Sequence, residues 1–133
     1  MNKLIQTRLH NSEKSNERGN CFPTVIACLM GYESPEDVIQ IQEYYKGVEE
    51  EEDHNWIDVL MQWLNERNYD WYGLEGHQFD DSFYLVTGRT ERGTVHVCIY
   101  KNGKLYHDPH PSGKGLTEIL NYEIIERIKN PTD

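Results

Sequence analysis

Basic residues are scarce in this chain. Only 13 lysines and arginines stand against 23 aspartates and glutamates among 133 residues, so the formal net charge is -10 and the sequence pI is about 5.0. A protein that binds nucleic acid through its phosphates needs a basic face. No basic patch is visible in the sequence, and we therefore argue against nucleic acid as a primary partner. The acidity instead favours solubility or repels acidic ligands.

Cysteines and long apolar runs are also few. The three cysteines, Cys21, Cys28 and Cys98, are an odd number, which does not favour a disulfide framework. Residues 1–10 contain no apolar run long enough for a signal peptide. No segment approaches the ~20 apolar residues of a membrane span. We therefore expect a cytoplasmic protein in a reducing setting, with no membrane partner.

The apolar residues that are present suffice for one core. Hydrophobic residues make up 37% of the chain and aromatic residues 11%, while charged residues stay at 27%. This is not a disordered composition. The length leaves little room for a second core, and no internal repeat or long linker divides the chain. The sequence therefore predicts a single domain over residues 1–133.

The first half of the chain has the pattern of helices. Apolar side chains cover nearly all sides of residues 21–30, which predicts a buried helix with Asn20 as its N-cap and Gly31 at its end. A serine, a proline and two acids then predict a second helix over residues 34–46. Apolar residues at helical spacing predict a third helix over residues 55–67.

The second half has the period of strands. We expect strands over residues 82–87, 94–100 and 104–107. Residues 122–128 fit a strand or a helix, and we favour a strand. The Asn-Gly pair at 102–103 is the signal of a tight hairpin. Helices that precede an antiparallel sheet define the α+β class.

Cys21 is the best candidate for a reactive side chain. It opens the first apolar helix, where backbone N–H groups carry a partial positive charge that favours a thiolate. Its own amide can also donate to a carbonyl oxygen that approaches the sulfur. Cys28 and Cys98 lie inside apolar segments and fit the role of small buried side chains. That role is also the alternative for Cys21.

His96 and Asp108 are the candidates for a base and for the residue that orients it. On a two-residue period, His96 shares a strand face with Cys98 and Tyr100, and one face of this strand must meet the helical layer. The hairpin at 102–103 places Asp108 at the same end of the next strand, where a carboxylate can accept the imidazole N–H. The alternatives are a core histidine with satisfied hydrogen bonds and a turn aspartate before proline.

Two further groups of polar residues bear on the chemistry. Gln6 lies upstream of Cys21, and its side-chain amide can supply a second donor to an oxyanion; the alternative is a solvated glutamine near a terminus. His107, Asp108 and His110 are metal-ligand types. A shared metal site would need an unusual loop, because a proline lies between the two histidines. We therefore predict neither a metal nor another cofactor.

The assembled residues resemble a known family. Gln6, the Gly-Asn-Cys-Phe run at 19–22, His96 in a strand and the segment 106–112 after a hairpin look like the small papain-like cysteine hydrolases of bacteriophage genomes. The resemblance extends from Gln6 to about Leu116, in the order Gln, Cys, His, Asp of the papain-like superfamily. It implies a reduced papain-like fold, in which N-terminal helices pack on an antiparallel sheet. It also implies four catalytic roles: Gln6 as oxyanion donor, Cys21 as nucleophile, His96 as base and Asp108 as the residue that orients His96.

The function that follows is acyl transfer through a Cys21 thioester, by a cysteine peptidase or amidase. The expected substrate is a peptide or another amide, and the expected place is the cytoplasm, or the host cytoplasm if the protein is phage-encoded. The alternative from another class is a phage-type binding or inhibitor protein that occupies a host protein and keeps the scaffold without turnover. A third interpretation is a metal-dependent hydrolase that uses His107, Asp108 and His110.

Overall fold

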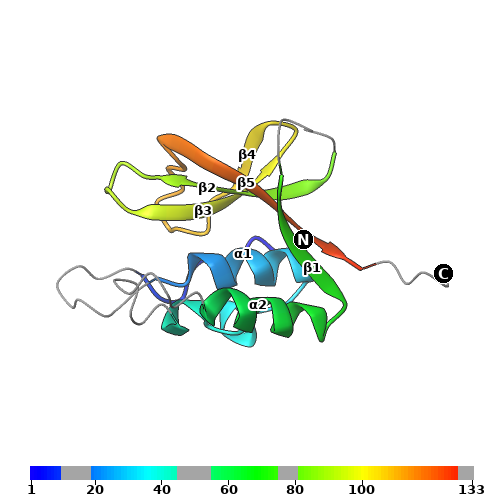
Figure 1. Cartoon of the computed structure of the whole chain (residues 1–133). Helices are drawn as coiled ribbons and strands as arrows, with labels where there is room; N and C mark the ends of the chain where they lie inside the picture. Colours follow the sequence, from blue (N-terminus) through cyan, green and yellow to red (C-terminus); the bar gives the residue numbers. More distant parts are fainter. Residues whose placement is uncertain (10–18, 45–54, 75–80, 129–133) are drawn as a thin grey trace.

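Two α-helices lie on one side of an antiparallel sheet (Figure 1). The computed structural model describes residues 1–9, 19–44, 55–74 and 81–128. Within these ranges the helices precede the strands, so the predicted α+β class is confirmed. The elements in chain order are α1 (Cys21–Met30), the 3₁₀ turns η1 (Pro35–Asp37) and η2 (Ile41–Tyr44), α2 (Asn55–Asn65), β1 (Tyr69–Leu74), β2 (Phe83–Arg89), β3 (Val95–Lys101), β4 (Lys104–His107) and β5 (Glu118–Arg127).

The five strands follow the spatial order β1-β5-β2-β3-β4, and every neighbouring pair is antiparallel. The last strand in sequence, β5, therefore lies between β1 and β2, while the β3–β4 hairpin forms one edge of the sheet. β5 approaches β2 closely at Gly88, where a Cβ atom would lie 2.1 Å from the Glu118 carbonyl oxygen. Among the described residues, no helix has the length and apolar character needed to cross a membrane.

The hydrophobic core lies between the helices and the sheet. Its side chains come from both layers, and burying each large aliphatic one contributes roughly 1.5–3 kcal/mol. Those exposed by 2% or less are Val25, Ile26, Ala27 and Cys28 of α1, Ile41 of η2, Leu60 and Leu64 of α2, and Leu85, Val97 and Ile99 of the sheet. The core thus fixes the first turn of α1 against β3.

Helix α1 forms where the sequence predicts it, but its N-terminus differs in one respect. Asn20 does not cap the helix with its side chain. The Asn20 carbonyl oxygen instead accepts hydrogen bonds from the Thr24 N–H at 3.0 Å and from the Thr24 hydroxyl at 2.7 Å. The C-terminus ends as predicted, because Gly31 takes a left-handed conformation at φ 81°.

The helix predicted over residues 34–46 is wrong within the described range. Ser34 does cap a helical turn, and its hydroxyl accepts from the Glu36 N–H at 3.1 Å. The turn then breaks at Val38, whose backbone is extended, and the Gln40 side chain donates to the carbonyls of Pro35 and Val38, both at 2.8 Å. A run rich in β-branched residues disfavours a helix here, and a side chain replaces the missing helical hydrogen bonds. Residues 45 and 46 lie outside the described ranges.

The strand predictions are confirmed in position, with two differences. β5 begins at Glu118 rather than at residue 122, and β1 was not predicted at all. β1 follows α2 after a short turn in which Asn68 has a positive φ of 64°. Its aromatic residues Tyr69 and Trp71 alternate along the strand and pack against the core, a pattern typical of a half-buried strand.

Candidate catalytic site

The β3–β4 hairpin controls which side chains face one another at the site. Asn102 and Gly103 both have positive φ, 52° and 77°, as a two-residue primed turn requires. Tyr100 pairs with Leu105, but the register then shifts by one residue, so that Ile99 pairs with His107. Cross-strand partners project to the same face of a sheet.

This register shift, a β-bulge, decides the orientation of Asp108. Without it, Asp108 would continue opposite Val97 and would share the face that packs on α1. With it, Asp108 continues opposite Cys98 and comes to the face that carries His96. The predicted meeting of His96 and Asp108 therefore depends on one extra residue in β4.

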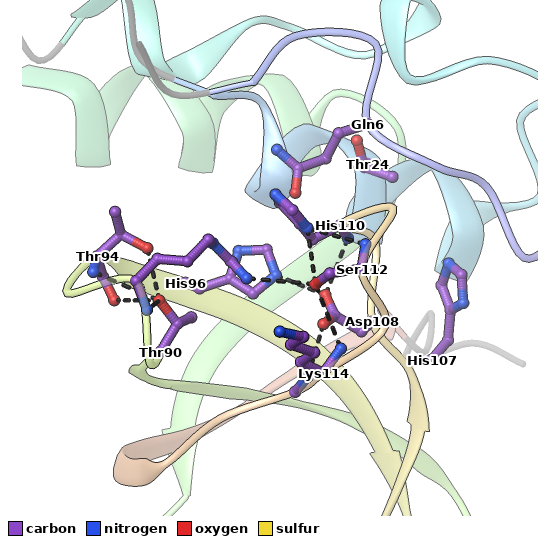
Figure 2. A network of polar contacts seen from close by, with 12 residues as sticks. Gln6, Thr24, Thr90, Thr94, His96, His107, Asp108, His110, Ser112 and Lys114 are labelled. Carbon is purple, nitrogen blue, oxygen red and sulfur yellow. Dashed lines mark hydrogen bonds and ion pairs between the residues drawn. The ribbon is translucent and has the colours of Figure 1, made fainter. Parts of the chain in front are cut away.

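His96 and Asp108 form a short buried hydrogen bond (Figure 2). The distance from His96 Nε2 to Asp108 Oδ1 is 2.6 Å, and the two side chains are only 5% and 1% exposed. A carboxylate can only accept, so the proton of this bond lies on Nε2. Nε2 is thereby occupied, and Nδ1 is the ring nitrogen left for other chemistry.

The loop after β4 holds the Asp108 carboxylate in place. The His110 N–H donates to Oδ1 at 2.9 Å and the Gly115 N–H donates to Oδ2 at 2.8 Å. Burial opposes the charge on Asp108, but the hydrogen bonds from His96, His110 and Gly115 hold its pKa well below the usual value. Asp108 is thus an ionised, preorganised acceptor.

Two thiols also affect the charge of His96. Burial opposes the charged form of the ring, but the hydrogen bond to Asp108 and the interactions with Cys21 and Cys98 outweigh burial and raise the pKa of His96 to about 11. Cys21 is the first residue of α1 and is half-buried, while Cys98 is fully buried two residues along β3 from His96. The structure therefore pairs His96 with Asp108, and Cys21 interacts with the same ring. A catalytic role for the three residues stays a prediction.

Gln6 is hydrogen-bonded to the loop that carries Asp108. Its backbone N–H donates to the Pro109 carbonyl at 2.9 Å, which places the residue next to the loop that carries Asp108 (Figure 2). Its side-chain nitrogen donates to the Arg8 carbonyl at 3.1 Å, and its side-chain oxygen is buried without a hydrogen-bond partner. One N–H of the Gln6 amide is therefore not used by the hydrogen bond to Arg8.

Asn20 ties the N-terminal segment to the start of α1. Its side chain is fully buried; Oδ1 accepts from the Arg8 N–H at 3.0 Å, and Nδ2 donates to Thr7 Oγ1 at 2.8 Å and to Gln40 Oε1 at 3.2 Å. The Asn20 N–H also donates to the Arg8 carbonyl at 3.0 Å. Asn20 thereby positions the segment of Gln6 beside Cys21, a role that the predicted N-cap does not include.

The alternative metal site of His107, Asp108 and His110 is not assembled among the described residues. His107 points away from His110 (Figure 2), and its Nε2 donates to the Leu4 carbonyl at 2.5 Å. The His110 ring instead lies 6.1 Å from that of His96, between centroids, and its Nδ1 accepts from the Ser112 N–H at 3.0 Å. Burial and the charge of Arg92 lower the pKa of His110.

Sequence reasoning missed two contributors to the site. The first is Cys98, which the alternation along β3 places on the face of His96; that signal was present in the sequence and was interpreted as ordinary burial. The second is the pair of loop N–H groups from His110 and Gly115 that hold Asp108. No sequence signal identifies which backbone amides will point at a carboxylate.

Comparisons with known proteins do not extend this description. No protein-family model, no curated protein and no solved structure matches the chain significantly. The functional interpretation therefore depends on the geometry of the site itself.

Proposed function

We propose that the protein is a cysteine hydrolase of peptidase or amidase type, with a reduced papain-like scaffold, Cys21 as nucleophile, His96 as base and Asp108 as the residue that orients His96. The observation that carries this proposal is the buried hydrogen bond between His96 Nε2 and Asp108 Oδ1, and the effect of the Cys21 thiol on the pKa of His96 supports it. A nucleophile, a base and an orienting carboxylate in this order are the parts that acyl transfer requires.

The His96–Asp108 bond supports the assignment of the base. Because Asp108 holds the proton on Nε2, Nδ1 is free to take the proton of Cys21. The raised pKa of His96 favours the form in which the ring already carries that proton. In the proposed reaction Cys21 attacks after it has lost its proton, and the imidazolium of His96 is the acid beside it.

The proposed reaction has two halves. The Cys21 sulfur forms a bond to the substrate carbonyl carbon, the C–N bond breaks, and the imidazolium of His96 gives its proton to the leaving amine. Water then attacks the thioester and gives a proton to His96, which restores the thiolate and releases the acid. The Cys21 N–H at the start of α1 and the unused N–H of Gln6 are the proposed donors to the oxyanion.

A direct test is to trap the thioester with a generic acyl donor. Wild-type protein treated with p-nitrophenyl acetate should release nitrophenol in a burst, and peptide mass spectrometry should find one acetyl group on Cys21. Cys21→Ala should show neither result, and His96→Ala should show only slow release. Cys28, which is 1% exposed and lies about two helical turns along α1 from Cys21, is the internal control and should stay unmodified.

Two outcomes would count against the enzyme. Equal acetylation of Cys21 in wild type and His96→Ala would remove the base from the mechanism. A wild-type protein that gives no acetyl-Cys21, together with a Cys21→Ala variant that keeps the full biological effect, would favour the binding-protein alternative instead.

A further inference from the structure

We infer that His96, Cys98 and Asp108 form a regulatory site for a thiophilic divalent cation of the zinc type, and that its occupation switches off the nucleophile. This inference rests on the proposed function for its effect, but not for the binding itself. The donor atoms of the three residues all lie within 4.8 Å of one another. All three residues are buried, at 5%, 0% and 6% exposure.

The donor set has the chemistry of a zinc site. Imidazole nitrogen, thiolate sulfur and carboxylate oxygen are the three protein ligands of Zn²⁺, and a mixed set with sulfur disfavours Mg²⁺ and Ca²⁺. Tetrahedral zinc with bonds of about 2.0–2.3 Å holds its ligands roughly 3.3–3.8 Å apart. The widest separation in the cluster therefore needs to close by about 1 Å, while the His96–Asp108 pair, now at 2.6 Å, opens to admit the ion.

The supporting contacts are also those of a metal site. Ligating carboxylates are normally held by hydrogen bonds from outside the cluster. Asp108 has two such bonds, from the N–H groups of His110 and Gly115, and both remain possible when a metal replaces the proton of His96. Cys98 and His96 lie two residues apart on one strand, so β3 presents both donors from a rigid element.

The cluster gives Cys98 a role that core packing alone does not explain. A buried thiol normally packs as a small apolar side chain. The Cys98 sulfur instead lies within 4.8 Å of donor atoms of both members of the buried His96–Asp108 pair. A thiol must lose its proton to bind zinc, so occupation of the site releases one proton to solvent.

Metal binding would reverse the tautomer that the mechanism needs. A cation on Nε2 displaces the proton shared with Asp108, and a neutral ring then carries its proton on Nδ1. With a proton on Nδ1 and a cation on Nε2, His96 cannot accept the proton of Cys21. Occupation of the site therefore inhibits the enzyme without any contact between the metal and Cys21.

The test uses Co²⁺ as a spectroscopic probe and Zn²⁺ as the inhibitor, with the full-length metal-free protein. Wild type should bind one Co²⁺ with a thiolate-to-cobalt absorption band, and so should Cys28→Ala, the matched control at a buried cysteine away from His96. Cys98→Ala should lose the band, and its affinity should fall at least about 10–100-fold. Cys21→Ala should keep both the band and the affinity.

The second readout is inhibition. One equivalent of Zn²⁺ should slow the alkylation of Cys21 by iodoacetamide in wild type and Cys28→Ala, but not in Cys98→Ala. Cys98→Ser, which nearly preserves side-chain size, serves if Cys98→Ala does not fold; it should lose the thiolate band and the inhibition as well. Circular dichroism checks the fold of each variant.

The two proposals fail in different ways. An unreactive Cys21 in metal-free protein would overturn the proposed hydrolase. The cobalt band would still test metal binding at His96, Cys98 and Asp108. Loss of the band in Cys21→Ala, with retention in Cys98→Ala, would overturn the metal proposal, because the thiolate ligand would then be Cys21. Absence of any thiolate band in wild type would overturn it equally.

Discussion

The two halves of the candidate site differ in burial and in hydrogen bonding. On the sheet side, β3 and the loop after β4 bury His96 and Asp108, and every oxygen of the Asp108 carboxylate accepts a hydrogen bond. On the other side, the N-terminal segment 1–9 is largely exposed, and the Gln6 side-chain oxygen has no partner. The His96–Asp108 pair is thus held by several hydrogen bonds, whereas the buried side-chain oxygen of the proposed second oxyanion donor has none.

The contacts that hold each half explain this difference. The sheet side is fixed by strand pairing and by charged hydrogen bonds. The N-terminal segment is attached through individual hydrogen bonds to several elements, including Gln6 N–H to the Pro109 carbonyl, Leu4 N–H to the Cys28 sulfur and Arg8 N–H to Asn20. The Arg8 guanidinium adds exposed ion pairs with Glu36 and Glu43, which contribute little to stability in water. No strand of the sheet includes residues 1–9.

The largest effect is expected for His96→Ala. Removal of the base should lower the rate of acyl transfer to p-nitrophenyl acetate by roughly 10⁴–10⁶-fold, because Cys21 loses the group that accepts its proton. Stopped-flow release of nitrophenol measures the rate. His107→Ala is the matched control, since His107 is equally buried but bonds to the Leu4 carbonyl. Equal losses in both variants would mean that folding, not proton transfer, is affected.

Asp108→Asn should have the next largest effect. The amide cannot hold the Nε2 proton as a carboxylate does, so the wrong tautomer of His96 is favoured, and the rate should fall by about 10⁴-fold. The same assay measures it, with Asp81→Asn, at an exposed position, as the control. A rate within a few-fold of wild type would show that the sheet side does not need its orienting residue.

Gln6→Ala should have a smaller effect that tests the N-terminal half. Loss of one oxyanion donor typically lowers kcat by about 10²–10³-fold with little change in KM. Ile5→Ala, at the neighbouring and exposed position of the same segment, is the control. If kcat does not change in Gln6→Ala, the Cys21 amide is the oxyanion donor without help from this segment. The N-terminal half of the site would then have a structural role only.

Asn20→Ala should disturb the link between the halves. The variant removes the hydrogen bonds that the fully buried Asn20 side chain makes with Arg8 N–H, Thr7 and Gln40, and the free energy of unfolding should fall by roughly 1–3 kcal/mol. Urea denaturation measures the loss. Asn121→Ala is the matched control, because it lies in the exposed part of β5 and its amide donates only to Glu123. Similar losses in both variants would contradict a linking role for Asn20.

A further expected effect is a pH dependence of stability that arises from the His96–Asp108 pair. The pKa of His96 is raised from 6.5 to about 11, so its contribution is complete below pH 6.5 and is lost as pH rises toward 11. The pKa of Asp108 is lowered from 3.8, so its contribution is complete above that pH and is lost as pH falls below it. Stability should therefore be greatest between about pH 4 and pH 6.5, and Asp108→Asn should flatten both slopes in urea titrations. Unchanged slopes would show that the pair is uncharged.

Local chemistry made part of this structure predictable. The apolar run from Cys21 and the glycine at 31 specify α1, and the Asn-Gly pair at 102–103 specifies the hairpin. Both signals act within a few residues, where backbone preferences dominate. Because Cys21 begins the helix and His96 lies in the strand, their residue types and positions identified them as candidates for nucleophile and base.

Other features depend on contacts between distant segments. The bulge in β4, which turns Asp108 toward His96, is not encoded in the Asn-Gly signal. The side chain of Asn20 hydrogen-bonds with Arg8 and Gln40 instead of capping the helix, because the fold brings these partners close to it. β1 was missed because its pairing with β5 spans more than 40 residues of chain. Local propensity does not report such pairings.

The most direct test of the central claim is the alkylation rate of Cys21 by iodoacetamide at pH 6, compared between wild type and His96→Ala by peptide mass spectrometry. If the His96–Asp108 pair holds the proton of Cys21, wild type should react roughly tenfold faster or more. Cys28 should remain unlabelled in both proteins. Equal rates at Cys21 would show that the imidazole does not activate the sulfur, and would contradict the account.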